Sequence, residues 1–384
     1  MPGAYLRGMG LKCALGESVE ACLLNLEQRQ VRPVNLTLPE FPEPFRIRYY
    51  RIPDQLEMFD PARFESLILP VVQAAILQAG LNQEEIRRLP VFIGSSSFTI
   101  GRSELGYADA WRRHPGQAIP MPSCGYQDLA ELLNRRLNCH GESYAYNTAC
   151  TASANALLAA LRMIENGIYR HALVIGTELA NRTTLTGFSA LQLLATSLQP
   201  FDHMRQGVVL GEGIGAIVLS GVAGRQAGIR VIGGSSNCDT WSLTTANING
   251  HSAASVMRLA LKQAQARPQD ICAIKAHGTS TRSGDAAEAR GLHQVFGQLP
   301  PLTVLKPYVG HTLGACCITE LVMLASALIR GFIPETPGFK VPDPELAIYP
   351  LATSIPAPDG LYLLNHFGFA GNNTVLVLEK NAAP

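Results

Sequence analysis

The chain has 384 residues, of which 47% are hydrophobic and 16% charged, and its net charge at neutral pH is +1. This composition is typical of a well-buried globular enzyme and excludes a disordered or fibrous chain. A net charge so close to zero predicts no long-range attraction to nucleic acid or to an anionic membrane, so we expect neither as a partner.

The hydrophobic pattern predicts short buried strands that alternate with helices along the chain. The expected strands lie at 4–8, 90–94, 170–175, 215–220, 229–232, 271–275, 302–305, 361–364 and 374–379. The expected helices lie at 18–28, 61–80, 126–137, 255–266, 286–296 and 313–329, and one more lies within the stretch 146–165. We expect a turn at 8–10, an extended surface segment at 31–56 and an irregular polar connection at 101–125. Strands alternating with helices predict an α/β layered fold with buried sheets.

Three further features bear on location. The nine cysteines are odd in number, have no CxxC spacing and include the adjacent pair Cys316 and Cys317, which suits neither a disulfide nor a metal clip. The N-terminus has no sustained apolar run, so we expect no signal peptide. The longest apolar stretch, 313–329, contains Glu320 and predicts a core helix rather than a membrane span. Together these features favour a cytoplasmic protein.

The stretch 146–165 places Cys150 where polar turn residues give way to a long apolar helix pattern. Asn147 or Thr148 can cap this helix. The Cys150 sulfur would then lie near a helix N-terminus, where the dipole favours the thiolate, which is the nucleophilic form. The alternative is a small buried cysteine in a helix contact.

Four segments share reactive or glycine-rich residues just past a buried strand or at a helix start, where α/β folds assemble their sites. They contain Cys150 (NTACTAS), His277 (KAHGTSTRSGDAAE), Lys306 with His311 (LKPYVGHTLGA) and Phe367 (NHFGFAGNN). A thiolate beside two imidazoles suits acyl transfer followed by carbanion chemistry. Each segment alone also has a structural interpretation: a satisfied histidine, a helix cap, a surface charge or a hairpin turn.

Taken together, these segments resemble the β-ketoacyl-acyl carrier protein synthases of the elongating Cys-His-His type. The resemblance runs from about residue 91 to 379 and includes the segment FDHMRQGVVLGEGIGAIVL. It implies a thiolase-like α/β fold of five layers in two similar halves, residues 1–222 and 223–384. It also implies a homodimer, with a heterodimer of related subunits as the other possibility.

The resemblance also implies residue roles. Cys150 would carry the acyl group, while His277 and His311 would promote decarboxylation of a malonyl thioester and stabilise the enolate. Lys306 would set the electrostatics of the histidine pair, with Asp285 and Glu288 as its partners.

The backbone N–H groups of Cys150 and Phe367 would form the oxyanion hole, and the Phe367 side chain would act as a gate. Thr279 and Thr281 would bind the phosphopantetheine arm. Glu320 is similar to a glutamate that helps to form a structural monovalent cation site in some members.

The implied partners are an acyl carrier protein and acyl and malonyl thioesters. No cofactor would be required, because the carrier brings its own phosphopantetheine. The basic pairs Arg112-Arg113 and Arg135-Arg136 are candidates for docking an acidic carrier.

The chain departs from the family pattern at three positions. Ser280 and Ala370 stand where glycines are usual, and His366 stands where a small residue is common. The first 60 residues also match poorly. These departures favour a specialised synthase, in a secondary-metabolite or specialised lipid pathway.

Three alternatives stay open. A thiolase would need a second cysteine in a C-terminal turn that here contains none. A ketoacyl synthase III type would use a His-Asn pair, and Asn365 and Asn373 lie near the required position. A chain-length-factor-like partner would shape a pocket without condensing, but such subunits usually lack the nucleophilic cysteine.

Overall fold

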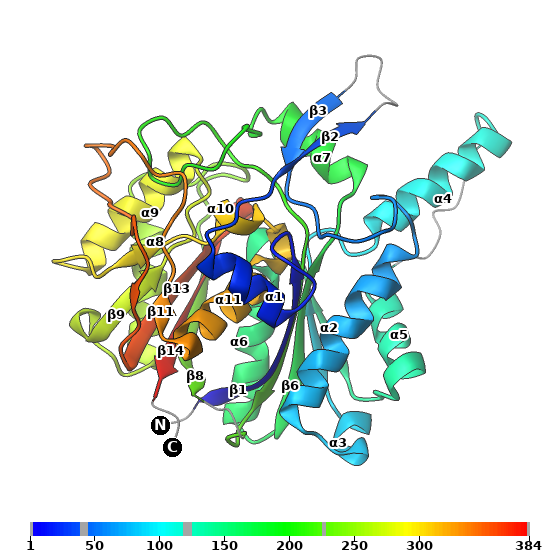
Figure 1. Cartoon of the computed structure of the whole chain (residues 1–384), viewed down its shortest axis with the longest axis horizontal. Coiled ribbons are helices and arrows are strands. Elements are labelled where there is room, and N and C mark those ends of the chain that lie inside the picture. The colour runs from blue at the N-terminus through cyan, green and yellow to red at the C-terminus, as the bar shows by residue number, and fades with distance from the viewer. Residues whose placement is uncertain (1–2, 39–44, 118–124, 225–227, 382–384) are drawn as a thin grey trace.

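The computed structural model describes residues 3–38, 45–117, 125–224 and 228–381. Its main feature is a ten-stranded sheet in the order β10-β9-β13-β14-β8-β1-β7-β6-β4-β5 (Figure 1). The strands from the N-terminal part are β1 (Ala4–Cys13), β4 (Val91–Gly94), β5 (Ser143–Tyr146), β6 (His171–Glu178) and β7 (Gly213–Ser220). Those from the C-terminal part are β8 (Ile229–Cys238), β9 (Ile271–Lys275), β10 (Leu302–Thr303), β13 (Gly360–Phe367) and β14 (Asn372–Lys380).

The two parts of the sheet repeat one topology. Starting from the junction, the first part runs β1-β7-β6-β4-β5 and the second runs β8-β14-β13-β9-β10. The pairings also match, because the first two in each part are antiparallel and the last two are parallel. Only Ala4 and Tyr5 of β1 pair with β8 across the junction. The structure is therefore built of two similar α/β halves, although the division at residue 222 stays a prediction.

Alternating side chains divide the core into layers. In β13, Tyr362 and Leu364 face the cluster around the central helices, while Leu361 and Leu363 face the other side. Successive side chains of a strand point to opposite faces of the sheet, and here both faces are buried. The central helices are α6 (Ala152–Glu165) and α11 (Cys316–Arg330), which lie between the two halves of the sheet (Figure 1).

Other helices cover the outer faces. On the outer face of the N-terminal half lie α2 (Arg63–Ala79), α3 (Gln83–Arg87) and α5 (Gln127–Leu137). On the outer face of the C-terminal half lie α8 (His251–Gln263) and α9 (Arg282–Val295). The order helix, sheet, helix, sheet, helix confirms the five-layered thiolase-like fold.

Helix α11 is apolar on every side because it forms the middle of the central layer. The segment Leu313–Arg330 is long and apolar enough to cross a membrane, but 89% of it is buried inside the protein. A helix that is hydrophobic all round is expected in a core of this kind, so the prediction of a core helix is confirmed.

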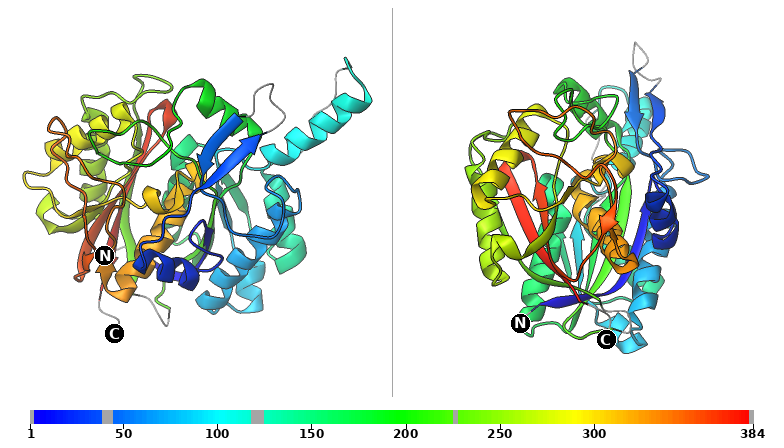
Figure 2. Two further views of the ribbon diagram at one scale, coloured as in Figure 1. Left: turned by 45° about the horizontal axis from the view of Figure 1, so that its top comes forward. Right: turned by 60° about the vertical axis from the view of Figure 1, so that its left-hand side comes forward.

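The remaining elements are short or peripheral. They are α1 (Val19–Glu27), the ribbon β2 (Val34–Leu38) with β3 (Phe45–Tyr49), α4 (Ile100–Arg113), α7 (Arg182–Ala190), α10 (Lys306–Val309) and the pair β11 (Phe332–Ile333) with β12 (Ile355–Pro356). The ribbon and α4 extend from the body of the molecule (Figure 2).

Two local predictions were wrong. Residues 8–10 are part of β1 and form no turn. A side chain at Gly8 or Gly10 would come within 2.0 Å of the carbonyl oxygens of Ala75 and Val71 in α2, so these glycines permit close helix–strand packing. The segment predicted to be irregular contains α4, whose exposed surface left no clear apolar face in the sequence. Residues 118–124 of that segment lie outside the described residues.

Candidate active site

The four motif segments meet at one edge of the sheet. Cys150 follows β5, His277 follows β9, His311 follows β10, and Phe367 ends β13. Strands β9, β10 and β13 are mutually parallel, so their carboxyl ends lie together. The structure therefore brings together residues that are up to 217 positions apart in the sequence.

Cys150 lies in a short 3-10 turn, Ala149–Thr151, immediately before α6, and its side chain is 6% exposed. Ala149 has φ +50°, a left-handed conformation that is strained for a residue other than glycine. The side chains of Asn147 and Thr148 make no capping hydrogen bond to this helix, so that prediction was wrong. The turn directs the Cys150 sulfur to within 3.1 Å of Nε2 of His311.

The resting form of Cys150 is the thiol rather than the expected thiolate. Burial raises its pKa to about 11, although the Lys306 ammonium and the backbone N–H of Phe369 both act to lower it. The pKa of His311 lies well below its usual value because of burial and the charges of Lys306 and Lys275. The pair therefore rests as a neutral thiol beside a neutral imidazole.

Lys306 fixes the second histidine. Its ammonium lies 3.2 Å from Nδ1 of His277 and donates to the His277 carbonyl oxygen at 2.7 Å. Because an ammonium can only donate, Nδ1 is the acceptor and the proton of the neutral ring is on Nε2. Burial and the Lys306 charge keep the His277 pKa well below its usual value. His277 therefore presents an Nε2–H donor.

The partner of Lys306 is Glu320, at 2.9 Å, and not Asp285 or Glu288 as predicted. Glu288 accepts from the backbone N–H groups of His277 and Gly278, each at 2.8 Å. Asp285 accepts from those of Ser280 at 3.0 Å and Phe201 at 2.7 Å, and burial raises its pKa to about 7. Both carboxyl groups hold the loop after β9 in shape, and of these three acidic residues Glu320 is the one that contacts the Lys306 ammonium.

The glycine-rich turn after β13 reaches Cys150. A side chain on Gly368 would lie 3.2 Å from the backbone nitrogen of Cys150. The backbone N–H that interacts with the Cys150 sulfur belongs to Phe369, two residues beyond the one we predicted. Phe369 is therefore the better candidate to complete an oxyanion hole with the Cys150 N–H. The Phe367 ring lies 6.0 Å from that of His277.

These residues line a cleft that is partly open to solvent. Cys150, His277, His311, Phe367 and Phe369 lie along it. Thr279 and Thr281 also line it, and their hydroxyl groups share a hydrogen bond of 2.9 Å. Both threonines therefore lie in the same cleft as Cys150 and the two histidines.

Three residues that the sequence did not single out support the site. Glu178 is buried and accepts backbone N–H bonds from Ser96 at 2.9 Å and Gly314 at 3.0 Å, which ties the loop after β4 to the His311 segment. Cys316 donates from its sulfur to the Cys150 carbonyl oxygen at 3.1 Å. The third residue is Lys275, at the end of β9. Buried charged residues are rare in general, and that is the signal that could have identified Glu178 and Lys275.

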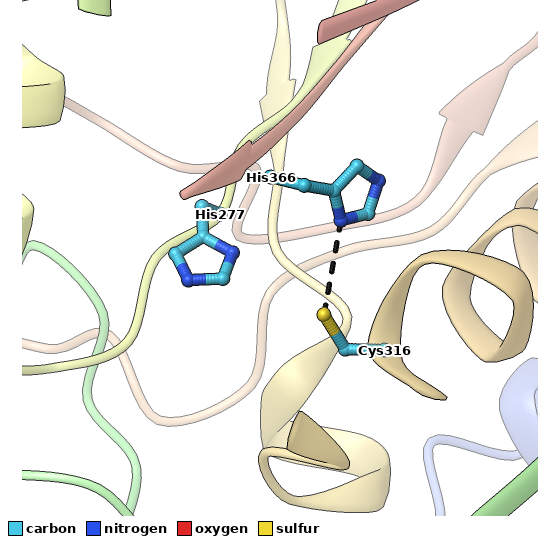
Figure 3. Close-up of side chains that lie close together, drawn as sticks. All are labelled: His277, Cys316 and His366. Atoms are coloured by element: carbon cyan, nitrogen blue, oxygen red, sulfur yellow. Dashed lines mark hydrogen bonds between the residues drawn. The ribbon is translucent and has the colours of Figure 1, made fainter. Parts of the chain in front are cut away.

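His277, Cys316 and His366 form a buried cluster whose potential ligand atoms all lie within 4.8 Å of one another (Figure 3). Nδ1 of His366 lies 3.8 Å from the Cys316 sulfur. The ammonium of Lys306 already lies at Nδ1 of His277, and that of Lys275 lies 3.4 Å and 3.5 Å from the two ring nitrogens of His366. Two adjacent positive charges make this a poor site for a metal ion.

The monovalent cation implied by the family resemblance does not fit either. The Glu320 carboxylate that would help to hold it is already bound by two ammonium groups, Lys306 at 2.9 Å and Lys275 at 2.5 Å. All three side chains are fully buried. A further positive charge would meet repulsion from both lysines.

Comparison with known proteins agrees with this geometry. Residues 42–223 match the model of the β-ketoacyl synthase N-terminal domain, and residues 229–340 match that of the C-terminal domain. The chain is 27% identical to 3-oxoacyl-[acyl-carrier-protein] synthase 2 of Vibrio harveyi, over 98% of both chains. It is 30% identical to the protein of the same name from a Synechocystis strain, over 68% of this chain and 67% of that one.

Solved structures give the same assignment. A β-ketoacyl synthase from Burkholderia phymatum superimposes with a TM-score of 0.84 at 25% identity, over 99% of this chain and 100% of that one. A chain from the complex of a ketosynthase with its chain length factor, from Xenorhabdus doucetiae, gives a TM-score of 0.83 at 25% identity, over 99% and 98%. The fold, the cysteine–histidine site and these matches together show that the chain belongs to the β-ketoacyl synthase family.

Proposed function

We propose that this protein condenses an acyl thioester with a malonyl thioester held on an acyl carrier protein, through an acyl-Cys150 intermediate. The observation that carries the proposal is the contact of 3.1 Å between the Cys150 sulfur and Nε2 of His311 at the wall of the cleft that also contains His277. A nucleophile, a base and an independent hydrogen-bond donor then share one site.

Acylation begins when the Cys150 sulfur attacks the carbonyl carbon of the acyl thioester. The thiol proton passes to Nε2 of His311, the bond from carbon to the carrier sulfur breaks, and the proton goes to the departing thiolate. Nδ1 of His311 is buried without a hydrogen-bond partner among the described residues. Its contact with the Cys150 thiol makes Nε2 the acceptor at rest, and no hydrogen bond at Nδ1 in that part of the chain opposes a change of tautomer. Nε2 can therefore accept a proton in this step and, once the ring proton has moved from Nδ1 to Nε2, donate in the next.

Condensation follows when the malonyl thioester loses CO₂ and its electron pair forms an enolate. The Nε2–H of His277, with that of His311, donates to the enolate oxygen. The enolate carbon then attacks the acyl-Cys150 carbonyl, the Cys150 thiolate leaves, and it takes up a proton. No metal or redox group has a part in this sequence.

The carrier arm would enter past Thr279 and Thr281, and Phe367 would move to admit the acyl chain. The chain would act in the cytoplasm, where its thiol stays reduced; the eight cysteines in the described residues are free. It would work as a homodimer or beside a related subunit, as the Xenorhabdus ketosynthase does with its chain length factor. The intact Cys150–His311 pair favours the condensing role over that of a non-condensing partner.

Ser280, His366 and Ala370, together with the modest identity to synthase 2 proteins, support a specialised pathway. The test is complementation of a strain that lacks its housekeeping elongating synthase. Full restoration of the normal fatty acids would count against specialisation.

The acyl-enzyme is tested by incubating the protein with a panel of acyl-carrier thioesters and measuring the intact mass. We expect a mass increase equal to one acyl group, lost in Cys150→Ala. Cys150→Gln should keep or raise malonyl decarboxylation while it abolishes condensation.

Cys238 is an exposed thiol, so Cys238→Ala is the matched control and should acylate normally. If Cys150→Ala still gained the acyl mass, the nucleophile assignment would be wrong. If no thioester acylated the wild-type protein, a missing subunit or a non-condensing role would be the better interpretation.

A further inference from the structure

Lys275 lies at the centre of an unusual buried charge cluster. It ends β9, is 1% exposed, and its ammonium lies 2.5 Å from Oε2 of Glu320. The other oxygen of Glu320, Oε1, accepts from Lys306 at 2.9 Å. One carboxylate thus bridges two ammonium groups in a part of the protein that excludes water.

The surroundings of the Lys275 ammonium are all electron-rich. Besides Glu320, it donates to the backbone carbonyl oxygen of Asn365 at 2.9 Å and lies 3.4 Å from Nε2 of His366. A carboxylate, a carbonyl oxygen and a ring nitrogen account for its three protons. Carboxylate and carbonyl oxygens are also the ligands that small hard cations prefer. The lysine therefore occupies a position whose neighbours would suit a cation.

The cluster connects directly to the catalytic donor. Lys275 binds Glu320, Glu320 binds Lys306, and Lys306 holds Nδ1 of His277 at 3.2 Å. Without Lys275, the buried Glu320 carboxylate would have one ammonium instead of two, and it would draw Lys306 toward itself and away from His277. The orientation and tautomer of His277 thus depend on a residue that does not line the cleft.

We infer that Lys275 is a positioning residue whose ammonium group permanently fills the place of a monovalent cation beside Glu320, which makes the enzyme independent of such cations. The kinetic part of this inference rests on the proposed function, while the cation independence of folding does not.

The first experiment uses the wild-type protein. Its unfolding temperature is measured in potassium, sodium and tetramethylammonium chloride at one ionic strength. We expect agreement within about 1 °C, because a ligand that binds only the folded state would raise this temperature. An increase of several degrees in potassium or sodium would overturn the inference, whatever the protein catalyses.

The second experiment creates the missing cation site. Lys275→Ala should slow malonyl decarboxylation by about tenfold or more, the order expected when a supporting partner of a functional ligand is lost. Acylation of Cys150, measured by intact mass, should change less. Added ammonium, methylammonium or potassium should restore decarboxylation in a saturable way, and tetramethylammonium, which is too large, should not.

Lys262→Ala removes an exposed lysine from the last turn of α8 and is the matched control, for which we expect wild-type rates without added cation. If Lys275→Ala does not fold, Lys275→Asn takes its place in the experiment. This variant supplies an amide oxygen in place of the ammonium, and its decarboxylation rate should depend on potassium.

Two results with folded variants would contradict the inference. One is full decarboxylation by Lys275→Ala in tetramethylammonium buffer, and the other is a defect that no small cation relieves. If the wild-type protein decarboxylates no malonyl thioester, the proposed function fails, but the unfolding measurements still decide whether Lys275 replaces a cation.

Discussion

Cys150 and His311, the proposed nucleophile and base, are both uncharged at rest. Burial raises the cysteine pKa and lowers that of the histidine, so charge separates only when the sulfur attacks. The helix N-terminus that suggested a preformed thiolate is outweighed by desolvation, because Cys150 is almost completely enclosed. The Lys306 charge lowers the pKa of Cys150, against the effect of burial, and it lowers the pKa of His311, in the same direction as burial.

This balance predicts how acylation depends on pH in Lys306→Met. His311 must be neutral to accept the thiol proton, so the rate falls as the pH drops through its pKa. Removing the ammonium removes a cause that holds this pKa down, so the pKa rises and the acidic limb moves to higher pH. The measurement is the rate of Cys150 acylation against pH.

The exposed Lys262 again supplies a control, since Lys262→Met should leave the acidic limb unchanged. An acidic limb of Lys306→Met that stayed in place or moved to lower pH would show that Lys306 does not set the charge state of His311.

At the scale of elements, each catalytic segment contains a non-glycine residue with positive φ. These are Ala149 at +50°, Ser280 at +68°, Leu313 at +46° and Ala370 at +57°. A non-glycine residue in this left-handed conformation lowers the stability of the fold by about 1–2 kcal/mol, and it persists where the surrounding structure holds it. Ser280 has a compensating contact, because its buried hydroxyl accepts from the backbone N–H of Gln199 at 2.7 Å.

The two positions that depart from the usual glycine should therefore respond differently to its restoration. Ala370→Gly relieves the left-handed strain and loses only a methyl group, so stability should stay within about 1 kcal/mol of wild type or rise. Ser280→Gly also loses a hydrogen bond and leaves the Gln199 N–H unpaired, which costs about 1–3 kcal/mol. Denaturant unfolding of both variants measures the difference. Equal effects would mean that the Ser280 hydroxyl does not stabilise the loop.

At the scale of the whole molecule, the basic pairs proposed for carrier docking lie away from the cleft lining and are paired locally. Arg112 and Arg113 both approach Asp109, and Arg135 and Arg136 both approach Glu65. Arg282 is different: it is exposed at the start of α9, between Thr281 and Ser283, which line the cleft. A negatively charged carrier or its phosphate would meet Arg282 as the arm enters.

We therefore expect Arg282→Glu to raise KM for malonyl-carrier protein without raising KM for the malonyl thioester of bare pantetheine, which lacks the phosphate and the protein. Loss of a charged contact at an interface rim acts mainly on association and weakens with salt. Steady-state kinetics at low and high salt measure the effect.

Arg112→Glu combined with Arg113→Glu is the comparison, and we expect a smaller increase in KM. A larger increase in KM for the Arg112 and Arg113 double variant than for Arg282→Glu would assign carrier docking to α4.

The sequence alone predicts the alternation of strands and helices, and it points to the cysteine and the two histidines that the fold brings together. Short apolar runs, helix periodicity and residues with few chemical alternatives are local signals, and they placed most of the predicted strands within a few residues of their observed bounds, although short strands such as β5 were missed. It also pointed to Lys306 and Glu320, but not to their contact.

Which charges meet depends on the folded arrangement of the elements. Asp285 and Glu288 lie close to His277 in sequence, yet they bind backbone N–H groups, while Glu320 reaches Lys306 and Lys275 from the central helix. The charge state of Cys150 and the role of Lys275 depend on burial and on partners from other elements. Desolvation and ion pairing depend on groups that are close in space but distant in sequence. A pattern along the chain therefore cannot predict the charge state of Cys150 or the partners of Lys275.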